Sequence, residues 1–210
     1  MIQKWLKSFI SGRLGRTLFM SKTSHARYLP NKVPQRSALS PALFNFHLSS
    51  LPELEDTLIL FYADDLILAA RDKNISIACT RLQTHLDLLE SWFVTNHLSP
   101  SFSKSSVTLF TSDRRQLDQH PELKIFEERL PISKTPKILG VIYDQCFTFS
   151  SHVDHIIKKL NKKRNALRAV AGSSFGQDKE KLRIIYKQYI RISLNYTSPA
   201  WAASLSSSNI

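Results

Sequence analysis

Two adjacent acids, Asp64 and Asp65, interrupt an apolar stretch of the chain, FYADDLILAA at residues 61–70. Two carboxylates about 4 Å apart repel each other by roughly 1 kcal/mol in water and by about 4 kcal/mol at an effective dielectric constant of 20. A divalent cation removes this repulsion, and carboxylate oxygens suit Mg²⁺, which completes its shell with water and substrate phosphates. The pair therefore indicates a site for Mg²⁺ or Mn²⁺. The alternative is a solvated hairpin tip whose acids aid solubility.

Nucleotidyl transfer is the chemistry that such a site could carry. Two ions roughly 3.5–4 Å apart can activate an attacking hydroxyl and stabilise the leaving pyrophosphate. Tyr62 lies shortly before the acids and offers an aromatic surface for stacking. Together these residues favour polymerase-type chemistry.

A hairpin is expected to position the acids, with strands over residues 57–63 and 66–70 that meet at the pair. Both faces of the first strand are apolar, which is typical of a strand covered on both sides, so the hairpin is expected in the centre of its sheet. Asp-Asp is a poor loop for a two-residue hairpin, because both central residues need positive φ. Local misfits of this kind often mark functional sites.

The rest of the chain shows mixed periodicity, which predicts an α+β fold. A short strand is expected within RTLFM at residues 16–20, and further strands at 106–111 and 137–143. Apolar residues at helical spacing, with Ser40-Pro41 as a start signal, predict helices at 2–10, 40–48, 75–94, 151–171 and 178–194.

The charge balance points to a polyanionic partner. The chain has 29 Lys and Arg against 17 Asp and Glu, a formal net charge of +12, which favours nucleic acid or an anionic surface. Its two cysteines, Cys79 and Cys146, lack the spacing of a disulfide framework or a zinc site. No stretch reads as a signal peptide or as a membrane helix. We therefore expect an intracellular protein, in the nucleus or cytoplasm, without a membrane partner.

Four motifs in a fixed order carry a family resemblance across residues 2–202. They are VPQRSALSPALFN at residues 33–45, YADD at 62–65, SWFVTNHLSPSFSKSSVTLF at 91–110, and KILGV at 137–141 followed by Tyr143-Asp144 and Phe147-Thr148-Phe149. In this order they resemble the reverse transcriptases of non-long-terminal-repeat retrotransposons, especially the jockey-type elements. The last motif resembles the strand pair with which that family seats the primer.

The resemblance implies a role for each matching residue. Asp64 and Asp65 would bind Mg²⁺ or Mn²⁺, with Asp64 the more directly catalytic, and Tyr62 would lie against the primer end or the incoming nucleotide. Gln35 would line the nucleotide and template pocket. Lys104 would donate a proton to the leaving pyrophosphate, and its alternative is a solvated loop lysine. The implied partners are an RNA template, a DNA primer and deoxynucleoside triphosphates, while protein partners stay open.

The chain also departs from the family pattern. Arg36 stands where family members carry a glycine, and its bulk is expected to impair the fit of template and nucleotide. The family also uses another aspartate on an upstream strand, together with a fingers region, and this chain begins after both. We therefore expect a fragment truncated at both ends and inactive alone.

A basic helix follows these motifs. An apolar stripe from Val153 to Leu167 leaves most of its basic residues on the other side, where they would suit the phosphate backbone of nucleic acid or a plain solvated surface. His152 and His155 lack an acid or cysteine partner, so a zinc site is not expected there. The candidate nucleic-acid-binding residues are Lys158, Lys159, Lys162, Lys163, Arg164 and Arg168.

These observations predict a partial reverse-transcriptase palm, an antiparallel sheet with packed helices, over residues 1–145. The start of a helical thumb and a C-terminal tail follow over residues 146–210. The reaction of the full-length ancestor would be RNA-directed DNA synthesis. The alternatives are a catalytically dead remnant that binds nucleic acid and a chain that does not fold stably, because a missing strand would expose an apolar sheet edge.

Overall fold

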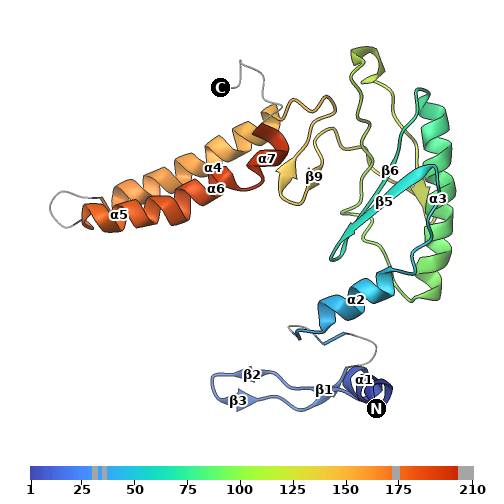
Figure 1. The fold of residues 1–210 in the computed structure, drawn as a ribbon, viewed down its shortest axis with the longest axis horizontal. Coiled ribbons are helices and arrows are strands. Elements are labelled where there is room, and N and C mark those ends of the chain that lie inside the picture. The colour runs from blue at the N-terminus through green and yellow to red at the C-terminus, as the bar shows by residue number, and fades with distance from the viewer. Residues whose placement is uncertain (30–32, 35–36, 172–175, 203–210) are drawn as a thin grey trace.

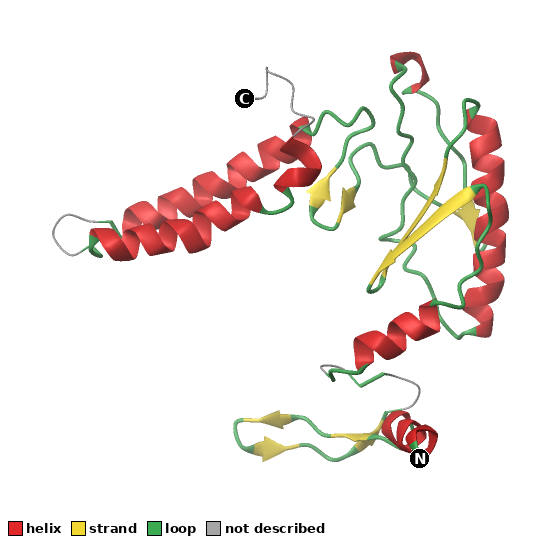
Figure 2. Cartoon of the chain, viewed as in Figure 1, coloured by secondary structure: helices red, strands yellow, loops and turns green. Residues whose placement is uncertain are grey.

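The computed structural model of the chain describes residues 1–29, 33–34, 37–171 and 176–202. The chain follows an open crescent, with an N-terminal segment at one end, a mixed helix and strand body in the middle and a long helical arm at the other end (Figure 1). Short strands and helices are both present along the chain, and the longest helices lie in the body and in the arm (Figure 2). The overall class is α+β, as the sequence predicts.

The N-terminal segment is a short helix followed by two small strand pairs. Helix α1 (Ile2–Ile10) has no buried residue, and its Trp5 and Phe9 rings stack at 5.3 Å. Strand β1 (Leu14–Gly15) pairs with β4 (Arg27–Tyr28), and β2 (Leu18–Phe19) pairs with β3 (Lys22–Thr23), both antiparallel. The predicted helix at 2–10 is confirmed, and the strand expected within 16–20 is the two-residue β2.

The body is built on a hairpin and a long helix. After helix α2 (Ser40–Leu48), strands β5 (Thr57–Tyr62) and β6 (Asp65–Ala70) pair antiparallel over their full length, and helix α3 (Ile75–Thr95) packs against them. The Asn74 side chain accepts a hydrogen bond from the Ser76 amide and so caps the start of α3.

One hydrophobic cluster holds this body together. Leu86 and Leu89 of α3 lie at its centre, where Leu89 is only 1% exposed. Ile59 of β5 and Leu68 of β6 pack against it from one face of the hairpin, and they are direct cross-strand neighbours. The cluster also contains Leu48 at the end of α2 and Leu51 just after it, Val107 in the segment after α3, and Leu123 and Ile125 further along the chain.

A fully buried histidine ties α3 to the base of the hairpin. His85 has no exposed surface, its Nε2 lies 2.9 Å from the Pro52 carbonyl oxygen, and its Nδ1 lies 2.5 Å from the Thr57 hydroxyl. Because a carbonyl can only accept, Nε2 carries a proton and donates it to Pro52. His85 therefore fixes both the start of β5 and the segment that leads into it.

Two further hairpins connect the body to the arm. Strands β7 (Lys124–Ile125) and β8 (Glu128–Arg129) pair beside α3, where the Gln83 side chain bonds both the amide and the carbonyl of Lys124. A short 3-10 helix, η1 (Arg114–Gln116), precedes them. Strands β9 (Lys137–Ile138) and β10 (Val141–Ile142) form the second hairpin.

The arm consists of two antiparallel helical runs. Helix α4 (Ser150–Ala169) forms the first, and α5 (Lys179–Ile185), a π-helical segment η2 (Tyr186–Arg191) and α6 (Ile192–Asn195) form the second. Helix α7 (Ser198–Trp201) returns to the root of the arm. A second hydrophobic cluster lies there, made of Val141, Phe149, Ile156 and Trp201.

The prediction of a central hairpin covered on both faces is wrong for the described residues. The β5–β6 pair forms a sheet of two strands, with α3 on one face only. The other face carries Leu58, Leu60 and Tyr62, whose side chains are 50–67% exposed. The apolar residues at every second position of β5 therefore form a face that no described element covers.

Two predicted strands also differ from the structure. The segment 106–111 forms a single parallel bridge, from Val107 to Ile132, because Pro131 beside it has no amide hydrogen to extend a ladder. The predicted strand 137–143 is split into β9 and β10 by a turn at Leu139-Gly140, whose φ values are 47° and 87°. Glycine inside the apolar run was the signal for that turn.

Replacing His85 should destabilise the body. We expect His85→Ala to lower the free energy of unfolding by about 2–3 kcal/mol, because the Pro52 carbonyl and the Thr57 hydroxyl lose a buried partner and a cavity remains. Urea unfolding followed by Trp92 fluorescence would measure the loss. The matched control His120→Ala removes an exposed imidazole and should leave the midpoint unchanged; equal midpoints for both variants would contradict the role of His85.

Candidate functional site

The acid pair lies at a tight turn, one residue away from where the sequence places it. Tyr62 pairs with Asp65, so the two loop residues are Ala63 and Asp64, and Asp65 begins strand β6. Only Ala63 of the loop has positive φ, at 53°. The predicted Asp-Asp loop is therefore wrong, since the chain avoids positive φ at both acids by placing alanine at the strained position.

The two ends of the hairpin differ in how their acids are neutralised. At the base, Arg81 of α3 forms ion pairs with Asp56 at 3.6 Å and with Asp72 at 3.1 Å. At the tip, Asp64 and Asp65 are exposed and form no ion pair or side-chain hydrogen bond with any described residue. The tip therefore keeps two adjacent carboxylates without a cation, and it faces the open side of the crescent (Figure 1).

The donor set of the tip fits a hard divalent ion in chemistry. Its oxygen atoms are charged and reachable from solvent, which suits Mg²⁺ or Mn²⁺ with water and phosphate in the remaining positions. Within the described part of the chain, no group of three or more His, Cys, Asp or Glu residues could enclose a metal. Asp64 and Asp65 therefore offer an open site with two ligands.

The other predicted substrate residues are spread over separate segments. Tyr62 is 67% exposed and lies beside Asp65 across the strand pair. Lys104 is exposed in a turn after α3, where its amide donates to the Ser101 carbonyl, and its side chain forms no hydrogen bond or ion pair with either acid. Gln35 and Arg36 lie outside the described residues.

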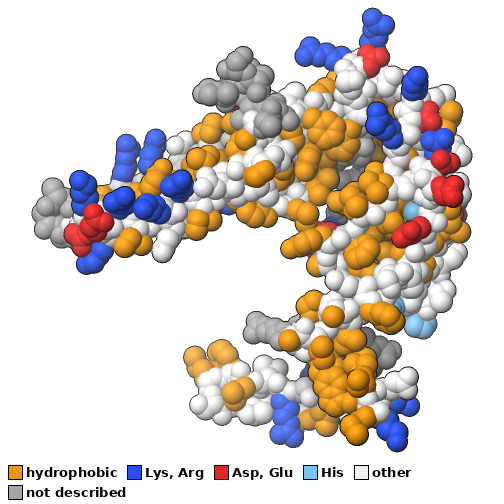
Figure 3. Space-filling model, viewed as in Figure 1, with side chains coloured by type: hydrophobic (Ala, Val, Ile, Leu, Met, Phe, Trp, Pro, Cys, Tyr) orange, Lys and Arg blue, Asp and Glu red, His pale blue; other side chains and the backbone are white. Residues whose placement is uncertain are grey.

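Five of the six predicted nucleic-acid-binding residues lie exposed along α4. Lys158, Lys159, Lys162, Arg164 and Arg168 form no ion pair with a described residue. Residues 150–201 contain eleven Lys and Arg against three Asp and Glu, a surplus of eight out of the whole chain's +12. Lys and Arg side chains gather toward the outer half of the arm (Figure 3).

Lys163 lies differently from its neighbours. Its ammonium donates to the Tyr189 carbonyl at 2.6 Å and to the Ser193 hydroxyl, and it lies 4.1 Å from the centre of the Tyr189 ring. Its partners belong to the π-helical segment and to α6, so Lys163 connects the two helical runs. The apolar stripe of α4 continues through this position, which the sequence pattern did not reveal.

Tyr196 joins the arm to the β9–β10 turn. Its hydroxyl donates to the Leu139 carbonyl at 3.0 Å, and its ring lies against Gly140. A Cβ at Gly140 would lie 3.1 Å from Tyr196 Cε1, and the φ of 87° also favours glycine. No local pattern predicts this contact, because its two residues lie 57 positions apart.

Asp144 organises the loop between β10 and α4. Its Oδ1 accepts from the Cys146 and Thr148 amides, and its Oδ2 accepts from the Thr148 hydroxyl and the Phe149 amide, over 2.5–3.1 Å. This carboxylate therefore serves the backbone and is not available to a metal. The position of Asp144 after an apolar strand and before a helix was the sequence signal for this loop-organising role.

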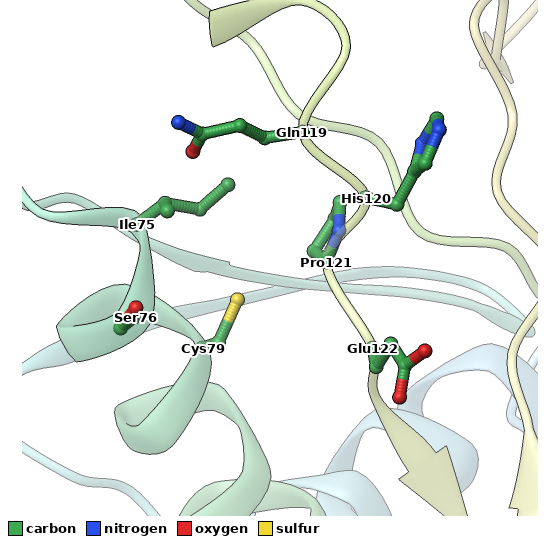
Figure 4. Close-up of a pocket in the computed structure, with 7 residues that line it drawn as sticks. All are labelled: Ile75, Ser76, Cys79, Gln119, His120, Pro121 and Glu122. Carbon is green, nitrogen blue, oxygen red and sulfur yellow. The ribbon is translucent and has the colours of Figure 1, made fainter.

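A pocket lies away from the acids. It has a volume of about 300 Å³ between the first turn of α3 and residues 119–122. Cys79 points into it and His120 turns its imidazole away from the sulfur (Figure 4). Burial raises the pKa of the Cys79 thiol, so the nucleophilic thiolate is disfavoured there. None of the predicted site residues lines this pocket.

His152 is buried at the root of the arm. Its Nδ1 accepts from the Ile142 amide at 3.3 Å, its ring meets Trp201 edge to face at 5.3 Å, and its Nε2 has no partner among the described residues. Burial, with the charge of His155 nearby, lowers the pKa of His152. A neutral imidazole in a packed cluster is the result.

Comparisons with known proteins cover most of the chain. The family described as reverse transcriptase (RNA-dependent DNA polymerase) matches residues 1–143. A probable RNA-directed DNA polymerase from transposon X-element of Drosophila melanogaster is 27% identical over 207 residues, 96% of this chain and 22% of that protein. The RNA-directed DNA polymerase from mobile element jockey of Drosophila funebris is 29% identical over 156 residues, 70% of this chain and 17% of that protein.

The chain thus spans about a fifth of the length of these curated relatives. No solved structure matches it. Among the described residues, no helix combines the length and the apolar character that crossing a membrane requires.

The lowered pKa of His152 predicts a pH dependence of stability. Below the ordinary pKa near 6.5, the unfolded chain takes up a proton that folded His152 does not. The free energy of unfolding is therefore unaffected by His152 protonation above about pH 7. It decreases as the pH falls below about 6.5, by up to about 1.4 kcal/mol per pH unit.

Urea unfolding at pH 5–8, followed by circular dichroism, would measure this slope. His152→Gln keeps an acceptor for the Ile142 amide and should flatten the acid limb. His25→Gln, at an exposed position, should keep the slope of the unmodified chain; the same flattening in both variants would contradict the assignment to His152.

Proposed function

The chain belongs to the reverse transcriptase (RNA-dependent DNA polymerase) family, and from this membership we propose that it supplies the metal-binding hairpin of an RNA-directed DNA polymerase of a mobile element. The contrast along the β5–β6 hairpin is the observation that supports this function. Arg81 neutralises the acids at its base, while Asp64 and Asp65 at its tip have no cation partner. An unneutralised pair at the end of a well-packed hairpin suits the binding of metal and nucleotide.

The proposed reaction extends a DNA primer on an RNA template. The primer 3′-hydroxyl oxygen forms a bond to the α-phosphorus of a deoxynucleoside triphosphate, the bond from that phosphorus to the bridging oxygen breaks, and pyrophosphate leaves. Mg²⁺ or Mn²⁺, when bound, would supply charge neutralisation and activation of the hydroxyl. Asp64 and Asp65 would hold the ion, and Tyr62 would support the primer end or the nucleotide.

Three further residues have proposed roles in substrate handling. Lys104 would give a proton to the leaving pyrophosphate, because an exposed ammonium can act as a general acid. Gln35 would line the nucleotide pocket, and Arg36 would narrow it where family members carry glycine. Such a chain would act inside the cell, in the nucleus or cytoplasm, where its template is found.

The proposed function assigns different roles to the two parts of the chain. Residues 1–145 would form the partial palm that carries the acids. Residues 146–210 would form a thumb-like region, whose arm would follow the phosphate backbone of the primer and template. The surplus of eight positive charges in residues 150–201 supports this assignment.

A second candidate function is nucleic-acid binding without catalysis. The exposed, unpaired basic residues of α4 support it independently of the acids. In this case Asp64 and Asp65 would be remnants of a metal site, and the arm would be the part of the chain that binds nucleic acid.

Substitution of the tip acids tests the metal site. We expect the chain to bind Mn²⁺ at a site that Asp64→Asn or Asp65→Asn removes, because each variant takes away a ligand charge. Electron paramagnetic resonance of free Mn²⁺ would count bound ions. Asp56→Asn, at the opposite end of the hairpin, is the matched control and should bind as the unmodified chain does.

Primer extension on an RNA template with Mg²⁺ then separates the two functions. Extension that Asp64→Asn abolishes supports the polymerase. Mn²⁺ binding that is indifferent to both tip acids, with no extension, would reject the catalytic proposal and leave nucleic-acid binding alone.

Adjacent lysines of α4 provide a test of the arm. Lys162→Met should reduce the salt dependence of binding to B-form DNA by about 0.9 in the slope of log K against log salt, because one phosphate contact is lost. Lys163→Met should leave that slope unchanged and lower the melting temperature, because its ammonium bonds within the arm. Fluorescence anisotropy at several salt concentrations and thermal melts give both values; a reversed pattern would contradict the assignment.

A further inference from the structure

An exposed aromatic pair lies between the body and the arm. The rings of Phe110 and Phe147 stack with centroids 4.7 Å apart and planes 22° from parallel. Their side chains are 36% and 47% exposed. Tyr143 meets both rings edge to face, at 6.4 and 6.2 Å, and so supports the stack from the interior side. The pair therefore presents a firm aromatic surface to solvent.

Hydrogen bonds fix the two segments that carry these rings. The Gln145 side chain donates to the Leu109 carbonyl at 3.2 Å, and the Thr111 amide donates to the Gln145 carbonyl at 3.0 Å, so both neighbours of Phe110 are bound to one residue. Phe147 has a φ of 55°, and its amide donates to the Asp144 carbonyl at 3.0 Å. The rings are thus held before any ligand arrives, which reduces the entropy cost of binding.

The segments that follow each ring along the chain carry basic residues. Arg114 and Arg115 of η1 follow Phe110 by four and five residues, and both are exposed without an ion pair to a described residue. On the other side, α4 starts three residues after Phe147 and carries the exposed lysines of the arm. Hydrophobic side chains gather between the body and the arm, with Lys and Arg groups on either side (Figure 3).

We propose that the Phe110–Phe147 pair is a stacking site for a base of single-stranded nucleic acid. Every base has an aromatic face, and alternating aromatic rings and cations are the pattern that binds a single strand without reading its sequence. The flanking cations would hold the phosphates on either side of the stacked base. The proposal rests on the proposed nucleic-acid function and adds a contact that the duplex-binding face of the arm does not supply.

The test compares two oligonucleotides of equal charge. Fluorescence anisotropy would measure binding of a labelled dT 12-mer and of an abasic 12-mer with the same sugar-phosphate backbone. We expect the base-containing strand to bind about tenfold more tightly, and Phe147→Leu to remove most of that ratio. Phe46→Leu, at an 80% exposed phenylalanine of α2, is the matched control and should keep the ratio.

A second variant keeps the test valid if Phe147→Leu does not fold. Phe147→Trp retains a ring for stacking, and its emission should be quenched by the dT 12-mer and not by the abasic strand. An unchanged ratio in folded Phe147→Leu, or no quenching in Phe147→Trp, overturns the stacking site. If both strands bind equally and salt weakens both, only the stacking site fails. If neither strand binds, the nucleic-acid function fails with it.

Discussion

The packing of α3 on one face of the hairpin is the interaction on which the acid site depends. A two-stranded hairpin is marginally stable in water by itself, so the rigidity of β5 and β6 must come from another element. Leu89 and His85 of α3 supply it at the base, through apolar burial and two buried hydrogen bonds. The tip lies six residues away, roughly 20 Å at about 3.3 Å per residue. The acids are therefore positioned by a helix with which their side chains form no hydrogen bond or ion pair.

Charge is distributed along the molecule in a way that keeps the tip anionic. Arg81 is the cation that α3 directs toward the hairpin, and it is occupied by Asp56 and Asp72. The surplus of positive charge lies in the arm, whose exposed lysines form no ion pair with described acids. A cation bound at the tip would thus meet two carboxylates without competition from a fixed side chain. The same separation leaves the arm free for phosphates.

Local patterns predicted the helices well and the sheet poorly. Helices α1, α2, α3 and α4 match the periodicity within two residues, because apolar spacing and start signals are local. The second helical run of the arm has the predicted length and is shifted by one residue, to 179–195, and the Tyr189 carbonyl in its π-helical centre accepts a hydrogen bond from Lys163 of another helix. Strand partners are set by distant residues, so the apolar run at 57–70 could not reveal that α3 covers one face alone.

In the candidate site, too, local features could be predicted from the sequence and long-range contacts could not. Residue type marked Asp64 and Asp65 as candidates, with a solvated hairpin tip as the alternative, and the order of the four motifs favoured the metal site. The contacts of Gln145, Asp144 and Tyr196 could not be foreseen, because each joins backbone groups of segments that lie apart in the sequence or curl back locally. The sequence pattern predicts Lys163 as a phosphate-binding candidate like its neighbours, because a stripe of apolar residues does not show which cation interrupts it.

The turn that carries the acids differs from the other hairpin turns of the described chain. Met20-Ser21, Phe126-Glu127 and Leu139-Gly140 each have positive φ at both loop residues, whereas Ala63-Asp64 has it at Ala63 alone. Positive φ at both positions belongs to the type I′ turn, and at the first position only to type II′. The second arrangement leaves Asp64 unstrained and returns Asp65 to the strand opposite Tyr62. The small residue between Tyr62 and Asp64 therefore carries the backbone strain, so that both acids are displayed side by side at no conformational cost to either.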